Sequence, residues 1–281
     1  MARTGPSSSG RPDRRPRRNP APKGPSTGRT GAPSPRPAGP GGAAASRGGA
    51  RTVVYGRNAV QEAVRGPRRV HRVWATRGAA AEANWPGVEL LPADADELTE
   101  RCGSDGHQGI CAEVELYRYA DAATLLRSPA PLIVALDEVT DPQNLGAVCR
   151  SAECAGATGV VIPERRSAEV TPAVCKASAG AVEHLPIARV RNLADFLGEA
   201  KGAGCWTYGA AAGAPMSYDE PDWSGGVVIV LGAEGRGLRP RVAASCDALI
   251  SLPMQGRIDS LNVSAAAAVL MYEILQQRSG A

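Results

Sequence analysis

Runs of hydrophobic residues alternate with stretches of helical spacing from residue 131 to the C-terminus. The hydrophobic runs are rich in Val, Ile and Leu and predict buried strands at 131–139, 159–163, 185–190, 205–211, 225–232 and 248–254. Helices are predicted between and after them at 144–156, 171–182, 192–204, near 238–246 and from about 260 to 277. This alternation is typical of a parallel sheet that is covered by helices on both faces.

A smaller α/β pattern precedes this region. Its predicted elements are a helix at 56–65, strands at 69–76 and 87–93, a helix at 94–103 and a strand at 107–116. The stretch YRYADAATLLRSPAP follows and joins the two patterns. The sequence therefore predicts an N-terminal domain at 51–118, a linker at 119–130 and a second domain at 131–281.

The first 50 residues differ from the rest in composition. They hold ten Lys or Arg against one acid, a net charge of +9, whereas the remaining 22 bases and 27 acids give −5. With ten Pro and ten Gly, this tail is predicted to be disordered. It is either a basic arm for RNA or a solvated, compositionally biased extension. The basic stretches 65–77 and 163–166 are likewise either RNA contacts or solvated charged faces.

Other composition features argue against several classes of protein. The seven cysteines are odd in number and include no Cys-x-x-Cys pair, which favours reduced thiols in a cytoplasmic protein. Three widely separated histidines argue against a metal site. No signal-peptide pattern and no apolar run of 18 residues is present, so neither secretion nor a membrane partner is expected.

Three predicted strand ends carry unusual polar or glycine-rich segments, at 137–150, 230–238 and 250–264. Ligands bind beyond the carboxyl ends of strands in open parallel sheets. Each segment also has a plainer interpretation. Asn144 could serve only as a helix cap, the glycines after residue 231 could form an ordinary turn, and Asn262 with its neighbouring serines could cap the last helix. Arg150, within a small and apolar helix, instead suggests an anionic ligand.

Taken together, the three segments resemble the SpoU/TrmH family of RNA ribose 2′-O-methyltransferases, in the SPOUT superfamily. The matching stretches are DPQNLGAVCRSAECAGATGVVIP, VLGAEGRGL and ISLPMQGRIDSLNVSAAAAVLMYEI, within 131–277. The region 52–116, with YGRNAVQEAV and HQGICAEV, resembles the substrate-binding domain of the members that modify 23S rRNA. The resemblance implies S-adenosylmethionine (SAM) as cofactor, a homodimer, a C-terminal trefoil knot and an L30e-like N-terminal domain.

The resemblance also assigns roles to residues at matching positions. Asn144 and Arg150 would be catalytic, Glu234 would support Arg150 or the substrate, and Ser260 and Asn262 would line the reacting centre. Because guanidinium stays protonated, Arg150 is interpreted as a stabiliser of the ribose oxyanion or a clamp on the adjacent phosphate. The proton acceptor stays open.

Three further positions are implied to meet the cofactor, largely through backbone atoms: Gly232, Leu252 and Leu261. The activity expected is methyl transfer to a guanosine of 23S rRNA. The alternatives are a tRNA or another rRNA site, and an RNA-binding ribosome assembly factor without activity. All five implied catalytic positions are intact, which favours an enzyme.

Overall fold

The computed structural model describes residues 50–83, 85 and 87–280, so apart from Ala50 the predicted tail lies outside the described residues. The described residues belong to a single unit. It contains two sheets, one in the N-terminal region and one in the C-terminal region. Among the described residues, no helix is both long enough and apolar enough to span a bilayer.

The N-terminal sheet has the strand order β1-β4-β2-β3. The central strand β4 pairs antiparallel with β1 and β2, and β3 runs parallel to β2. Helix α3 is confirmed where it was predicted, because Asp94 caps its first turn and Gly103 ends it at a φ of 62°. The elements are β1 (Arg51–Tyr55), α1 (Arg57–Arg65), β2 (Val70–Ala75), α2 (Arg77–Glu82), β3 (Leu90–Pro92), α3 (Ala95–Cys102) and β4 (Ile110–Glu115).

The C-terminal sheet has seven strands in the order β7-β6-β5-β10-β8-β11-β9, and every pair is parallel. The predicted α/β fold with a parallel sheet is therefore confirmed. Its strands are β5 (Leu132–Asp137), β6 (Gly159–Pro163), β7 (Ile187–Val190), β8 (Trp206–Ala210), β9 (Met216–Ser217), β10 (Val227–Gly232) and β11 (Ala248–Ser251). Its helices are α4 (Ala122–Leu126), α5 (Pro142–Cys154), α6 (Pro172–Ala177), α7 (Leu193–Gly202), α8 (Pro240–Ser245) and α9 (Val263–Arg278).

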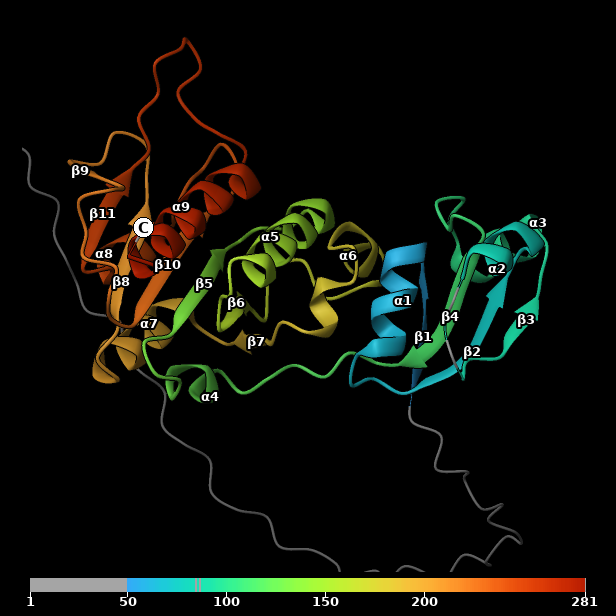
Figure 1. Ribbon diagram of the computed structural model, residues 1–281. Coiled ribbons are helices and arrows are strands. Elements are labelled where there is room, and N and C mark those ends of the chain that lie inside the picture. Colours follow the sequence, from blue (N-terminus) through green and yellow to red (C-terminus); the bar gives the residue numbers. More distant parts are fainter. Residues whose placement is uncertain (1–49, 84, 86, 281) are drawn as a thin grey trace, which may run out of the picture. The chain divides into compact units, whose positions relative to one another are not determined.

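Helices cover both faces of this sheet (Figure 1). On one face α5 and α9 pack against alternate side chains of the central strands, among them Val134, Leu136 and Ile229. On the other face α7, α8 and α4 cover the intervening side chains, such as Ile133 and Val230. The central strands β5, β6 and β10 are thus buried on both sides, which explains their unbroken hydrophobic runs.

Two helix predictions need correction. The helix predicted at 171–182 ends at Ala177, and after a turn with Gly180 at a φ of 89° the chain forms a short 3-10 helix at Ala181–Glu183. The last helix begins at Val263 and not near residue 260, because Asn262 is its cap. In addition, the segment predicted as linker contains α4.

Candidate active site

The first polar segment forms the turn between β5 and α5. Asp141 caps α5, since its carboxylate accepts a hydrogen bond from the Gln143 N–H at 3.0 Å, and Pro142 is the first helical residue. Asn144 therefore lies inside the helix, and its interpretation as a cap is wrong. Its side chain is free to contact neighbouring loops.

Asn144 meets one residue from each of the other two segments. The Asn144 side-chain N–H donates to Glu234 Oε1 at 3.0 Å, and the Asn262 side-chain N–H donates to Asn144 Oδ1 at 2.9 Å. Asn262 donates to Glu234 Oε1 as well. The segments that follow β5, β10 and β11 are thus joined by a closed triangle of side-chain hydrogen bonds, which we call the amide–carboxylate triangle.

Asn262 also holds the start of α9. Its Oδ1 accepts hydrogen bonds from the backbone N–H groups of Ser264, at 2.9 Å, and Ala265, at 3.4 Å, and from the Ser264 hydroxyl at 2.5 Å. One amide group therefore caps the helix with its oxygen and binds the triangle with its nitrogen. Capping and site formation, which the sequence offered as alternatives, are two roles of the same side chain.

Two of the predicted site residues lie apart from the triangle. Arg150 is exposed and six residues beyond Asn144, about 9 Å further along α5. Among the described residues, no hydrogen bond or ion pair joins it to Asn144, Glu234 or Asn262. Ser260 is exposed in the loop before α9, and its hydroxyl bonds the Asp259 carboxylate at 3.1 Å. The structure thus brings together three of the five residues.

An ion pair between half-exposed Arg239 and buried Asp137, which the sequence did not suggest, fixes the loop after β10. Asp137, fully buried at the end of β5, accepts from the Arg239 backbone N–H at 2.8 Å and from its Nε at 2.7 Å. The hydrogen bond to Asp137 raises the pKa of the Arg239 guanidinium. The loop at residues 233–238, which contains Glu234, is therefore anchored at its C-terminal end to β5, the strand that precedes Asn144.

The same loop folds back tightly on Gly232. A Cβ on Gly232 would lie 2.1 Å from the carbonyl carbon of Gly237, because the Gly237 N–H donates to Ala233 O at 2.8 Å and closes the loop. Gly235 and Gly237 have φ values of 74° and 65°, which glycine adopts without strain. The glycines thus set the position of Glu234.

Gly232→Ala should displace this loop and lower SAM affinity by about tenfold or more, with loss of turnover. Calorimetry with SAM measures the change. Gly198→Ala is the matched control, because a Cβ at this position in α7 meets no atom within 4 Å. Equal SAM affinity in the two variants would show that the loop does not border the cofactor.

The third segment is a loop whose exposed groups suit a partly apolar ligand. Leu252 is half-buried, whereas Ile258 and Leu261 expose 74% and 46% of their surface. Within the described part of the chain, residues 252–261 make no backbone–backbone hydrogen bond. Their N–H and C=O groups are thus open to a ligand that combines a flat apolar ring with polar edges, and SAM carries such a ring in its adenine.

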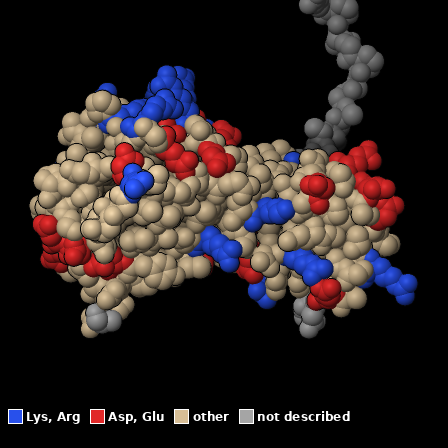
Figure 2. All heavy atoms as spheres, turned by 90° about the horizontal axis from the view of Figure 1, so that it is seen from above, with Lys and Arg blue, Asp and Glu red and all other residues tan. Residues whose placement is uncertain are grey.

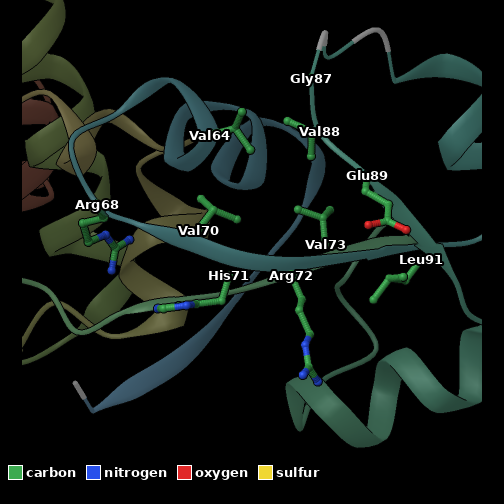
Figure 3. Close-up of a pocket in the computed structure, with 10 residues that line it drawn as sticks. All are labelled: Val64, Arg68, Val70, His71, Arg72, Val73, Gly87, Val88, Glu89 and Leu91. Atoms are coloured by element: carbon green, nitrogen blue, oxygen red, sulfur yellow. The ribbon is translucent and has the colours of Figure 1, made fainter. Parts of the chain in front are cut away.

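Two hollows lie outside this cluster. The larger, about 380 Å³, is in the N-terminal region, and none of the predicted site residues line it. Figure 3 shows Val64, Val70, Val73 and Val88 turned towards one another there, while the Arg68 guanidinium points away from them. The smaller hollow, about 290 Å³, is lined by Arg150 together with residues of α1.

Comparison with known proteins gives two family matches. Residues 131–272 match the SpoU rRNA Methylase family, and residues 53–120 match the family of RNA 2′-O ribose methyltransferase substrate-binding domains. The first match contains all eight predicted site residues. The second match contains the N-terminal sheet except for the first two residues of β1.

Individual relatives agree with these matches. The 23S rRNA (guanosine-2′-O-)-methyltransferase RlmB of Pseudomonas syringae pv. tomato is 40% identical over 243 residues, which are 80% of this chain and 96% of that protein. An uncharacterized tRNA/rRNA methyltransferase of Synechocystis is 39% identical over 240 residues, 80% of this chain and 62% of the relative. An AdoMet-bound rRNA methyltransferase from Sinorhizobium meliloti superposes with a TM-score of 0.67 at 27% identity, covering 80% of this chain and 86% of its own.

The geometry, the two family matches and the AdoMet-bound neighbour agree with one another. SAM is the cofactor, and the reaction is methyl transfer to an RNA ribose 2′-hydroxyl. The chain belongs to the SpoU rRNA methylase family.

Proposed function

We propose that this enzyme methylates the 2′-hydroxyl of a guanosine in 23S rRNA. The amide–carboxylate triangle carries the proposal, because it joins the three segments by which the chain resembles ribose methyltransferases. The 23S guanosine rests on the relative from Pseudomonas syringae and on the substrate-binding match at residues 53–120.

The cofactor would be held by Gly232, Leu252 and Leu261 and the open backbone groups of 252–261. SAM supplies an electrophilic methyl group on a sulfonium centre. Glu234 Oε1 is fixed by two amide donors, and among the described residues Oε2 has no hydrogen-bond donor. Glu234 Oε2 is thus free to accept a hydrogen bond from the ribose hydroxyl and orient its oxygen.

Arg150 would stabilise negative charge on the ribose oxygen or clamp the neighbouring phosphate, and Ser260 would line the reacting centre. Since Arg150 lies apart from the triangle of its own subunit, we infer a homodimer in which each site receives Arg150 from the other copy. Exposed Val269 and Tyr272 on α9 support such an interface, with 42% and 51% of their surfaces open.

The proposed domain boundaries are an L30e-like RNA-binding domain at 51–118, a linker at 119–130 and a catalytic domain at 131–281. A trefoil knot in the catalytic domain is supported by the path of its C-terminus. After β11, the chain must cross β8 and β10 before α9 can pack on α5. Arg278 then bonds the carbonyls of Ala130 and Gly225.

We expect RNA to contact this enzyme at separate small groups of basic side chains and not over one continuous basic surface. The chain from residue 51 onward is net acidic, and Figure 2 shows Lys and Arg in separate groups on one face with acidic side chains between them. A cytoplasmic location is proposed, in keeping with seven unpaired cysteines in the described part of the chain.

Methylation mapping of cellular RNA tests the function. Ribosomes from a strain that lacks the protein should lose one 2′-O-methylguanosine of 23S rRNA, and the purified enzyme with SAM should restore it. An unchanged 23S map, or a lost methyl group in tRNA instead, would refute the proposed substrate.

A further inference from the structure

The hydrophobic core that lies under α5 and α9 continues into the N-terminal region. The same cluster of buried side chains includes Val134 and Val148 of the catalytic domain and Val54, Val60 and Val114 of the N-terminal domain. The N-terminal domain therefore contacts its own catalytic domain through an apolar surface.

A buried ion pair lies in this contact. Arg68, which follows α1, donates from Nε to Glu183 Oε2 at 2.7 Å, and a second guanidinium nitrogen bonds Oε1. The side chains expose only 7% and 0% of their surface. Burial lowers the pKa of Arg68, but the hydrogen bonds to Glu183 raise it overall. Arg68 belongs to a basic stretch that the sequence offered as an RNA contact, and the structure instead uses it to join the domains.

Two further contacts fix the position of the N-terminal domain against the catalytic domain. Lys176 of α6 donates to the Gly106 carbonyl at 2.5 Å and lies 5.5 Å from the centre of the Tyr55 ring. A Cβ on Gly180 would lie 2.5 Å from Cβ of Glu62 on α1, so only glycine allows α1 to approach this closely.

The contact places α1 beside the proposed catalytic arginine. The hollow of about 290 Å³ is lined on one side by Asn58 and Glu62 of α1 and on the other by Arg150 and Glu153 of α5. His184 also lines it, and its Nε2 lies 2.8 Å from Glu62 Oε2.

We propose that the N-terminal domain is docked on its own catalytic domain so that α1 and Arg150 form one RNA subsite, in which Asn58 contacts a base next to the target nucleotide. This inference rests on the proposed function. The two carboxylates in the lining disfavour a phosphate except at Arg150. Glu62 is already held by Arg65 and His184, whereas among the described residues the Glu153 carboxylate has no hydrogen-bond partner. The Glu153 carboxylate therefore suits the N–H donors of a nucleobase edge, which single-stranded RNA exposes, and the Asn58 amide can both donate and accept.

Gly180→Ala tests the docking. The added methyl group should separate α1 from the catalytic domain, raise KM for an rRNA fragment and lower kcat/KM by about tenfold or more, with SAM affinity unchanged. Gly156→Ala is the matched control, because Gly156 has a φ of 71° and a Cβ there meets no atom within 4 Å. It carries the same backbone strain and should keep kcat/KM for RNA.

Asn58→Ala tests the subsite without disturbing the contact, since Asn58 is exposed on α1. It should weaken affinity for the RNA fragment, measured by fluorescence anisotropy, and raise KM for RNA by about fivefold or more with little change in kcat. Gln61→Ala, on the same helix but outside the hollow, should match the wild type.

The two proposals fail in different ways. Absence of methyl transfer by the wild-type enzyme would refute the function, whereas RNA affinity of the variants would still decide the inference. Wild-type RNA affinity and KM in both Gly180→Ala and Asn58→Ala would overturn the docked subsite. Loss of SAM affinity in Gly180→Ala would also overturn it, because the glycine would then act on the catalytic domain itself.

Discussion

Asn262→Asp should lower kcat by about 100- to 1000-fold while the melting temperature changes little. The aspartate keeps the oxygen that accepts hydrogen bonds from the Ser264 and Ala265 N–H groups, so α9 stays capped. It loses the N–H donors that bind Asn144 and Glu234, and it places a second carboxylate against Glu234. Repulsion should then open the amide–carboxylate triangle.

A matched substitution separates catalysis from capping. Asn192 caps α7 in the same way, accepting from the Ala194 N–H at 3.1 Å. Asn192→Asp should therefore leave both kcat and melting temperature near wild type. Rates from methyl transfer to rRNA and melting curves of the two variants give the comparison. If Asn262→Asp retained kcat within a few-fold of wild type, the triangle would have no part in the reaction.

The sequence predicted the catalytic sheet well because buried parallel strands have an unmistakable composition. Strands such as Leu132–Asp137 and Val227–Gly232 are continuous hydrophobic runs that end in polar or glycine-rich segments. That pattern was enough to locate the three segments of the site. The resemblance of these segments to the SpoU/TrmH family then assigned site roles to Asn144, Glu234 and Asn262, which the structure places in contact.

Details that depend on distant partners were not predictable in this way. The helix predicted at 171–182 ends at Ala177, and Gly180 in the turn that follows lies against α1, more than 100 residues earlier. Arg239 pairs with the buried Asp137 only once β5 and β10 are neighbours. Asn144 was a plausible cap until Asp141 was seen in that role. Local sequence states which side chains are available, and the tertiary contacts decide which one is used.

Arg150→Ala should abolish methyl transfer while SAM affinity stays within a few-fold of wild type, because the arginine is expected to act at the ribose or its phosphate. Arg150→Lys should recover only part of the rate, since lysine keeps the charge but lacks the planar fork that binds two oxygens. Single-turnover rates and SAM calorimetry measure both effects. Arg241→Ala is the control, because this exposed arginine lies on α8 and pairs with Asp195 at 3.0 Å on the opposite face of the sheet. Near-normal turnover in Arg150→Ala would show that its proposed role is wrong.

Mixing two inactive variants decides whether Arg150 acts in the other subunit. A heterodimer of Arg150→Ala and Asn262→Asp has one site with an intact triangle that receives an intact Arg150 from the neighbouring copy. When equal amounts of the two variants exchange subunits at random, half of the dimers are mixed. If the arginine acts across the interface, each mixed dimer has one complete site of two, so the mixture should show about a quarter of wild-type activity. If Arg150 serves its own subunit, neither site is complete and the mixture should stay inactive. Activity in the mixture would thus explain why an arginine with no bond to the triangle among the described residues is nevertheless required.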